Sequence, residues 1–285
     1  MFEIVRKEWL HEVIFLIEVK APAIARKIKA GNFLVFRAKE GGERIPITVA
    51  EYDRKKGTVT CIIQVVGKST KLLSTFEKGD YIQDVVGPLG KPTEIKKYGL
   101  VGIVSGGLGI PLANLVAKEL RNAGNEVIGM VGARTKELLV WEEEMSKYCT
   151  EMDYCTDDGS FGMKGFTTNL LEKKIKELEK EGKKFDMIFT VGPTIMMKFI
   201  AGITKKYGIH TIASLNPIMV DGTGMCGACR VTVGGEIKFA CVDGPEFDAH
   251  QVDFDELLMR LGQYKKYEKV SYDLYLKECC GGKQK

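Results

Sequence analysis

One aspartate and three cysteines within residues 221–244, DGTGMCGACRVTVGGEIKFACVDG, have the types and spacing of a metal site. Cys226 and Cys229 are two residues apart, and Cys241 follows across a predicted hairpin. Plant-type iron–sulfur segments use a C-x4-C-x2-C run with a distant fourth cysteine. Asp221 stands where the first cysteine of that run would be, and a carboxylate oxygen can ligate iron although it is harder than a thiolate. The spacing therefore predicts Asp221, Cys226, Cys229 and Cys241 as metal ligands.

The surrounding residues favour a [2Fe–2S] cluster over zinc. Gly222, Gly224 and Gly227 would let the loop wrap closely, so that backbone N–H groups point at bridging sulfides. Structural zinc prefers four cysteines, three cysteines with one histidine, or two of each, and His250 is displaced from Cys241 by several residues. Structural cysteines without metal are the other alternative. Cys279 and Cys280 are interpreted as bystanders, because adjacent residues chelate one ion poorly.

A glycine-rich turn, GGLGIP at 106–111, follows a buried-type strand and begins a helical run. Without side chains at Gly106, Gly107 and Gly109 a pyrophosphate can approach the backbone, and the helix N-terminus supplies N–H donors. Pro111 after Ile110 suits a first helical turn, where no donor is lost. The motif is not a full GxGxxG, so a tight strand-to-helix turn is the alternative.

Two further stretches suit the same nucleotide site. Gly192 and Pro193 close another buried strand, and ligands of open α/β sheets bind at the carboxyl ends of strands, so 106–111 and 192–197 are predicted to face one cleft. Met196 and Met197 belong to that stretch, although methionine is also an ordinary core residue.

The stretch GARTKELL places Gly132 and Arg134 at the end of the second predicted strand of this part of the chain. Arg134 or Lys136 there suits the 2′-phosphate of NADP(H), whereas the nearby acids of WEEEM leave NAD(H) open.

The candidate residues lie in different parts of the chain, each with its own predicted secondary structure. Short β-branched runs between turn residues predict an antiparallel β-barrel over residues 1–97. Strands that alternate with helices predict a Rossmann-like parallel-sheet domain over 98–214. The metal-binding segment is expected at 215–250, followed by a helical tail at 251–285. The fold class is thus multi-domain β plus α/β.

Composition narrows the function classes. The chain has 285 residues, enough for two or three domains, and a net charge of +4 in which Lys alternates with Glu, as in KELEKEGKKFD. This pattern indicates solvated helix faces and no nucleic-acid partner. No apolar run reaches the roughly 18 residues of a membrane span, and we expect no signal peptide. A cytoplasmic location follows, where eight cysteines are expected as thiols or metal ligands.

An ordered set of motifs carries a family resemblance: ERIPITVAEYD, VVGKSTKLL, VVGPLGKP, GGLGIP, GARTKELL, DDGSFGMKG, VGPTIMM and DGTGMCGAC. Over nearly the whole chain, to about residue 250, the sequence resembles the ferredoxin-reductase superfamily. Within it, the chain is similar to electron-transfer subunits of dihydroorotate dehydrogenase B. It is most similar to small subunits of NADH-dependent ferredoxin:NADP+ oxidoreductases, also called sulfide dehydrogenase subunit beta. Pro111 is one residue early for the common GxGIxP form, and Asp221 resembles the oxidoreductase branch.

The resemblance implies FAD, which spacing and composition do not predict. In this superfamily an R-x-x-[ST] stretch contacts the flavin, and RIPIT supplies Arg44 and Thr48 one residue further apart, with Pro46 and Ile47 between them. The VVGKST stretch would hold the ribityl and diphosphate groups. Its residues are Val65, Val66, Gly67, Lys68, Ser69 and Thr70. Without the resemblance, both stretches would be interpreted as ordinary strand and turn.

The resemblance also implies an activity and partners. The chain would pass electrons between NAD(P)H, FAD and the [2Fe–2S] cluster inside a heterodimer with a larger flavin and [4Fe–4S] subunit. Ferredoxin would be reached through that complex, with electron bifurcation or polysulfide reduction as its overall reaction. Small subunits of this family bind NAD(H), which conflicts with the charge argument at Arg134. The alternatives are an electron-transfer subunit of dihydroorotate dehydrogenase B and a zinc-stabilised nucleotide-binding regulator.

Overall fold

Seven antiparallel strands form the N-terminal part of the chain. They are β1 (Phe2–His11), β2 (Ile14–Lys20), β3 (Phe33–Arg37), β4 (Arg44–Asp53), β5 (Thr58–Gln64), β6 (Tyr81–Ile82) and β7 (Asp84–Leu89). Their order in the sheet is β6-β1-β2-β5-β4-β3-β7. The two edge strands, β6 and β7, are separated in the chain by Gln83 alone, so the sheet must curl back on itself into a near-barrel. The predicted antiparallel barrel class is thereby confirmed, with α1 (Pro22–Lys27) and α2 (Lys68–Ser74) as additions.

The computed structural model describes the backbone of residues 1–281 and the side chains of residues 1–279. Cys280 therefore falls outside the described side chains. One strand escaped the sequence analysis. In β1, FEIVRKEWLH, only Ile4 is buried, because the charged residues of this edge-proximal strand face solvent. A strand with so little apolar content gives a weak period-two signal. Within residues 1–281, no helix is both long and apolar enough to cross a membrane.

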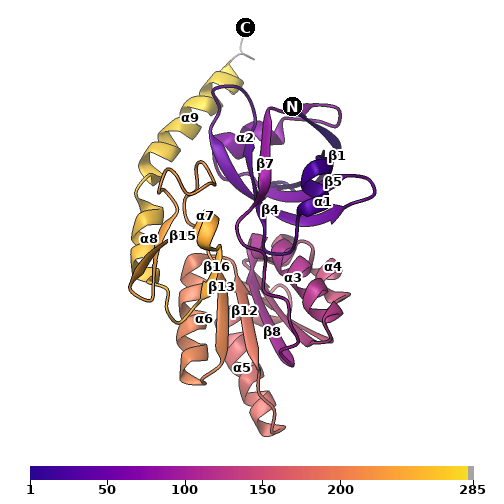
Figure 1. Ribbon diagram of the computed structural model, residues 1–285, viewed down its shortest axis with the longest axis vertical. Helices are drawn as coiled ribbons and strands as arrows, with labels where there is room; N and C mark the ends of the chain where they lie inside the picture. Colours follow the sequence, from indigo (N-terminus) through magenta and orange to yellow (C-terminus); the bar gives the residue numbers. More distant parts are fainter. Residues whose placement is uncertain (282–285) are drawn as a thin grey trace.

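A second sheet has the order β11-β10-β9-β8-β12-β13-β16, parallel except for its last strand. Its strands are β8 (Leu100–Gly106), β9 (Glu126–Ala133), β10 (Glu151–Thr156), β11 (Met163–Lys164), β12 (Met187–Val191), β13 (His210–Ser214) and β16 (Glu246–Asp248). Helices α3 (Ile110–Asn122) and α4 (Glu142–Ser146) cover one face, and α5 (Thr167–Lys180) and α6 (Thr194–Lys206) cover the other. The predicted Rossmann-like class is confirmed. Helix α3 lies between this sheet and the barrel, where it contacts β4 on one side and β8 and β9 on the other (Figure 1).

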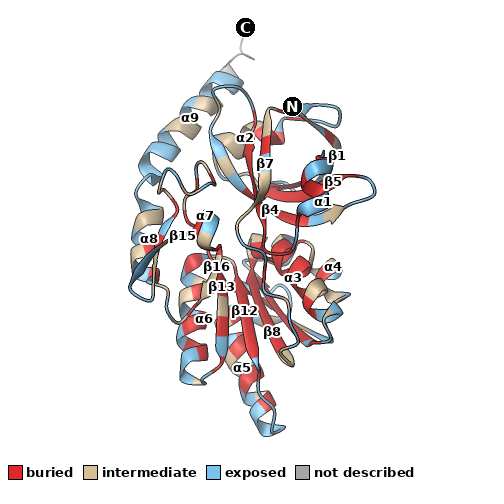
Figure 2. Cartoon of the chain, in the orientation of Figure 1, coloured by how far each residue is buried: buried red, intermediate tan, exposed pale blue. Residues whose placement is uncertain are grey.

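The C-terminal part begins with an irregular loop and a hairpin. The hairpin strands are β14 (Arg230–Val233) and β15 (Glu236–Phe239), followed by α7 (Ala240–Asp243), α8 (Phe254–Gly262) and α9 (Lys265–Gly281). The hairpin between Cys229 and Cys241 agrees with the sequence prediction. Helix α9 runs back along the molecule towards α2 and is largely exposed (Figure 2). The boundaries at 97, 214 and 250 stay predictions, although β16 pairs with β13 across one of them.

One buried cluster joins the barrel to the C-terminal part. Phe33 and Val35 of β3 pack in the same apolar cluster as Met219, Cys229 and Cys241. The barrel and the metal-binding segment therefore share a core. A substitution that alters packing in the metal-binding segment is therefore expected to alter the packing of strand β3 as well.

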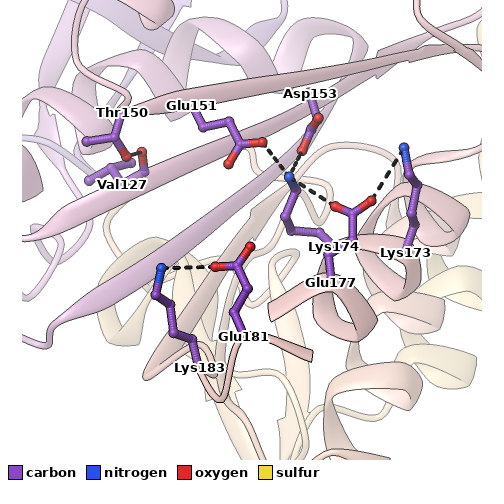
Figure 3. A network of polar contacts seen from close by, with 9 residues as sticks. All are labelled: Val127, Thr150, Glu151, Asp153, Lys173, Lys174, Glu177, Glu181 and Lys183. Carbon is purple, nitrogen blue, oxygen red and sulfur yellow. Dashed lines mark hydrogen bonds and ion pairs between the residues drawn. The ribbon is translucent and has the colours of Figure 1, made fainter. Parts of the chain in front are cut away.

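A network of ion pairs joins helix α5 to strand β10 of the parallel sheet. The Lys174 side chain is 8% exposed, and its Nζ lies 2.5 Å from Glu151 and 2.8 Å from Asp153, with Glu177 at 3.3 Å (Figure 3). Burial lowers the pKa of Lys174, but the bonds to Asp153 and Glu151 outweigh it and raise that pKa above its usual value. The lysine is thus charged, and it neutralises a carboxylate that is itself mostly buried.

Candidate metal centre and adjoining cavity

The four predicted ligands lie in two close pairs. Asp221 Oδ1 is 3.3 Å from Cys226 Sγ, and Cys229 Sγ is 3.2 Å from Cys241 Sγ. The hairpin produces the second pair: Arg230 is opposite Phe239, and the Ala240 N–H donates to the Cys229 carbonyl, so the chain returns beside its starting point. Cys226 is exposed while Cys229 and Cys241 are buried, so one pair faces solvent and the other faces the core.

The Asp221 carboxylate is held by its own loop. Oδ2 accepts hydrogen bonds from Thr223 Oγ1 at 3.0 Å, Met225 N at 3.1 Å and Cys226 N at 3.2 Å. Burial raises the pKa of Asp221, but hydrogen bonds from the Thr223 N–H, the Cys226 thiol, the Thr223 hydroxyl and the Met225 N–H outweigh it and bring the pKa to about 2. The carboxylate is therefore ionised at neutral pH. With Oδ2 occupied by donors, Oδ1 is the atom that faces the neighbouring cysteine.

Two pairs suit a dinuclear cluster better than one ion. Mononuclear zinc needs all its ligands about 2.0–2.3 Å from one point, whereas the four side chains here are paired two by two. A [2Fe–2S] cluster shares four ligands between two irons, as the two pairs would do. Gly222 has φ +77°, and a Cβ there would lie 2.6 Å from Leu89 Cδ1, so glycine lets this loop pack closely against β7. The residues present fit a [2Fe–2S] cluster.

A cavity of about 130 Å³ adjoins this centre. Residues 31–33 and 46–48 line it from the barrel, and residues 214–217, Met219 and Pro245 line it from the end of β13 and the metal segment. Leu112 of α3 completes the wall. The cavity therefore lies where all three parts of the chain meet.

The predicted flavin residues are divided by the structure. Pro46, Ile47 and Thr48 line the cavity, whereas Arg44 is exposed at the start of β4, opposite Arg37, and does not. The remaining stretch, Val65, Val66, Gly67, Lys68, Ser69 and Thr70, leads into the first turn of α2 and also lies outside the cavity wall.

Part of the hydrogen-bonding capacity of this turn is already used. The N–H groups of Val66 and Gly67 donate to Thr70 Oγ1, at 3.0 and 3.1 Å. The Ser69 hydroxyl donates to Glu43 at 2.7 Å. Thr70 therefore serves as a cap for its own helix, and the open space beside Gly67 is where another group can approach.

The two predicted nucleotide stretches are brought together. Strands β8 and β12 are neighbours, with Ser105 opposite Val191. A Cβ on Gly109 would lie 2.4 Å from the Val191 carbonyl oxygen, and a Cβ on Gly106 would lie 2.8 Å from Met196 Sδ. Gly192 and Pro193 therefore pack against Gly109 and Gly106, at the carboxyl ends of the two strands.

Some predicted nucleotide residues have no exposed side chain. Met197 is fully buried in the cluster that contains Cys229, so its side chain is core, as methionine at that position commonly is. Ile110 and Pro111 are buried at the start of α3, which leaves only backbone for a ligand. The buried side chain of Met197 favours the alternative interpretation of this methionine as a core residue.

The third nucleotide stretch lies at the end of β9. Gly132 is opposite Gly106 but faces α5, since a Cβ there would lie 2.6 Å from Thr167 Cγ2. Arg134 is exposed just beyond, and its carbonyl accepts from the Asp158 N–H at 3.3 Å. The loop after β10 thus borders the predicted ribose position, which the sequence analysis did not anticipate.

The sequence analysis also missed residues 214–217, which form one wall of the cavity. They follow β13 directly. The rule that ligands bind at the carboxyl ends of parallel strands, applied to this strand as well as to β8 and β12, would have indicated them.

Comparisons with known proteins agree with this architecture. Residues 216–253 match the family model for the iron-sulfur cluster binding domain of dihydroorotate dehydrogenase B. A Thermotoga maritima protein named dihydroorotate dehydrogenase B (NAD(+)), electron transfer subunit homolog is 50% identical over 96% of this chain and 95% of its own. The corresponding electron transfer subunit of Desulforamulus reducens is 32% identical over 84% of this chain and 92% of its own.

Solved structures show the same relationship. The structure of an NADH-dependent reduced ferredoxin-NADP oxidoreductase contains a chain 48% identical to this one, with a TM-score of 0.90 over 97% of this chain and 98% of that one. A ferredoxin NADP+ reductase from Neisseria gonorrhoeae, solved with FAD and NADP, is 16% identical with a TM-score of 0.58 over 73% of this chain and 90% of that one. This second likeness is one of fold.

Proposed function

The chain belongs to the dihydroorotate dehydrogenase B electron-transfer subunit family of the ferredoxin-reductase superfamily, and we propose that it passes electrons between NAD(P)H, FAD and a [2Fe–2S] cluster. One observation carries the proposal. The two ligand pairs adjoin a cavity lined by the flavin-type stretch 46–48, and Phe33 and Met219 belong both to the cavity wall and to the core around Cys229.

The residues of the chain have distinct tasks in this proposal. When bound, FAD exchanges a hydride with nicotinamide and single electrons with the cluster, and the protein positions these groups. Thr48 and residues 46–47 hold one side of the cavity, and residues 214–217 hold the other. Asp221 and Cys226 would bind one iron, and Cys229 and Cys241 the other. Phe33 and Met219 pack in the apolar cluster between the cavity and the buried pair and would keep water out of that path.

The nucleotide is proposed to lie over Gly106, Gly107 and Gly109, beside Gly192 and Pro193. We propose NAD(H) as the nucleotide, because the related oxidoreductase is NADH-dependent. Lys136 does not contradict this, since its ammonium group lies 5.4 Å from the centre of the Phe161 ring and is engaged there. Equilibrium titrations that give a lower Kd for NADPH than for NADH would reject this assignment and restore Arg134 as a 2′-phosphate ligand.

A partner subunit completes the proposed complex. The related structure comes from a study of flavin-based electron bifurcation. We propose that this chain likewise pairs with a larger flavin and [4Fe–4S] subunit that handles ferredoxin, with polysulfide as another possible acceptor of the complex. Purifying the native complex and sequencing the co-eluting chain tests this.

A second candidate is the electron-transfer subunit of dihydroorotate dehydrogenase B itself. It is favoured by the match of residues 216–253 and by the names of several relatives. Asp221 in place of a cysteine speaks against it, as does the similarity to the oxidoreductase structure. A native complex that reduces NAD+ with dihydroorotate would support this second candidate over the first.

Absorption spectroscopy of anaerobically purified protein tests the cofactors directly. We expect flavin bands together with a broad visible iron–sulfur band, FAD on chromatography of the released flavin, and about two irons and two sulfides per chain. A colourless protein that contains only zinc would overturn the proposal and favour the zinc-stabilised regulator.

A further inference from the structure

A carboxyl group that the proposed electron path does not use lies directly behind the cavity. Glu246 begins β16 and is opposite Ser214 of β13, a cavity residue, and it follows Pro245, another one. A Cβ on the cavity residue Gly31 would lie 2.8 Å from Glu246 Oε1. The carboxyl therefore lies against the outer side of the cavity wall. Three parts of the chain meet there: the barrel, strand β16, and the linker 90–99 between β7 and β8.

This carboxyl has one polar partner and no cationic one. Glu246 Oε1 accepts a hydrogen bond from Thr93 Oγ1 at 2.6 Å. Among the described side chains, no Lys, Arg or His forms an ion pair with it. The ionisable group beside it is Tyr98 on the linker, and Asp248 follows on its own strand. Glu94 is exposed and reaches the Tyr98 hydroxyl rather than Glu246. Lys91 meets this region through its backbone N–H, which donates to Gly244 O at 2.6 Å, and its side chain is exposed.

The surroundings of Glu246 bring the pKa of its carboxyl close to neutral pH. Burial raises its pKa to about 7, against the lowering effect of the Thr93 hydrogen bond. The residue is nevertheless partly exposed, so protons can exchange with solvent. Because a further negative charge in a poorly hydrated site raises the pKa of a neighbouring acid, the carboxylate responds to charge added in the cavity.

We propose that Glu246 takes up a proton from solvent when electrons arrive in the adjoining cavity, and that it releases the proton when they leave. This inference rests on the proposed function, which brings the electrons there as hydride from a nicotinamide nucleotide. At Glu246 one O–H bond forms between a carboxylate oxygen and a solvent proton. No electron passes through the residue, and the added proton offsets part of the added negative charge.

The pH dependence of the reduction potential measures this uptake. Spectroelectrochemical titrations of the wild-type protein, from about pH 5 to about pH 9, should show a steeper dependence of the flavin potential near neutral pH than the flavin alone requires. Glu246→Gln should lose that additional steepness. Glu94→Gln is the matched control: it removes the same charge from an exposed position of the linker and should behave as wild type.

A second variant separates proton uptake from a structural role. Thr93→Val removes the bond that lowers the pKa, so the steep region should move to higher pH. In infrared difference spectra, reduced minus oxidised, wild type should show a carboxylic acid band that Glu246→Gln lacks. The inference is overturned if flavin and cluster bands are intact while the pH profiles of wild type, Glu246→Gln and Thr93→Val coincide. If wild type carries neither flavin nor cluster, the proposed function fails and this inference fails with it.

Discussion

Asp221 is the residue on which the proposed metal centre depends most. Its carboxylate takes the place of a thiolate, and the loop satisfies Oδ2 with three donors while Oδ1 faces Cys226. Backbone N–H groups near a ligand set both its orientation and its electron-donating strength. A local motif of six residues, 221–226, thus contains the proposed ligand and the groups that orient it.

Substitution of Asp221 tests its role as a ligand. Asp221→Cys should retain a [2Fe–2S] cluster with an altered potential, because a softer ligand replaces a harder one. Asp221→Ala should lower cluster affinity by more than the ~10–100-fold typical of losing an outer-shell partner. Iron and sulfide analysis with a potentiometric titration provides the measurement. Unchanged cluster content and potential in Asp221→Ala would show that another group is the ligand.

At the scale of elements, the turn from β8 to α3 depends on two glycines for different reasons. Gly107 has φ +53° with no atom near its would-be Cβ, whereas Gly109 is constrained by the Val191 carbonyl oxygen 2.4 Å from its would-be Cβ. We therefore expect Gly107→Ala to cost about 1 kcal/mol of unfolding free energy through backbone strain. Gly109→Ala should cost about 3 kcal/mol, because a backbone oxygen cannot move aside without moving β12.

Urea denaturation of the two alanine variants distinguishes these causes. The larger loss is expected for Gly109→Ala. Equal losses would mean that β12 moves easily at Val191, and that the close approach of the turn to β12 is not what requires glycine at position 109.

The attachment of α5 to β10 gives another test at this scale. Lys174→Ala leaves Asp153, whose Oδ2 depends on the 2.8 Å ion pair, without a counter-charge. Breaking a fully buried pair costs about 3–5 kcal/mol, and solvent access of Glu151 and Glu177 reduces this here to about 2 kcal/mol. Lys173→Ala is the control, since Lys173 is exposed with one pair to Glu177 and should change stability by less than about 0.5 kcal/mol. Similar denaturation midpoints for both variants would contradict this account of the network.

At the scale of the whole molecule, Glu246 links stability to pH at the junction of the parts. Its pKa rises from 4.5 in the unfolded chain to about 7 in the folded one. A raised acid pKa means that the folded protein binds the extra proton, so this contribution is fully present below pH 4.5 and is lost as pH rises through about 7. Wild type should lose stability across this window, and Glu246→Gln should lose less.

Thermal unfolding at a series of pH values measures the difference between the two proteins. Only the difference is informative, because other groups titrate over the same range. Glu94→Gln should parallel wild type. Parallel curves for Glu246→Gln and wild type would mean that the carboxyl is hydrated in the folded protein and that its pKa is not raised.

The sequence by itself determined what depends on short spacing. The proposed ligand set of Asp221 and three cysteines rests on intervals within one loop and one hairpin. The glycine turn at 106–109 and the alternation of strands and helices follow from local periodicity, which the backbone geometry of each element imposes. The order of the barrel and the parallel sheet could be predicted for the same reason.

Only the tertiary structure decided how distant segments converge. It divided the ligands into two pairs, placed Met197 in the core, separated Arg44 from Thr48 at the cavity, and brought Glu246 behind Gly31. It also showed residues 214–217 as a cavity wall and paired β16 with β13. These arrangements depend on packing between segments far apart in the sequence, such as Gly31 and Glu246. Apolar burial is non-directional, so no local pattern in the chain records which partners meet.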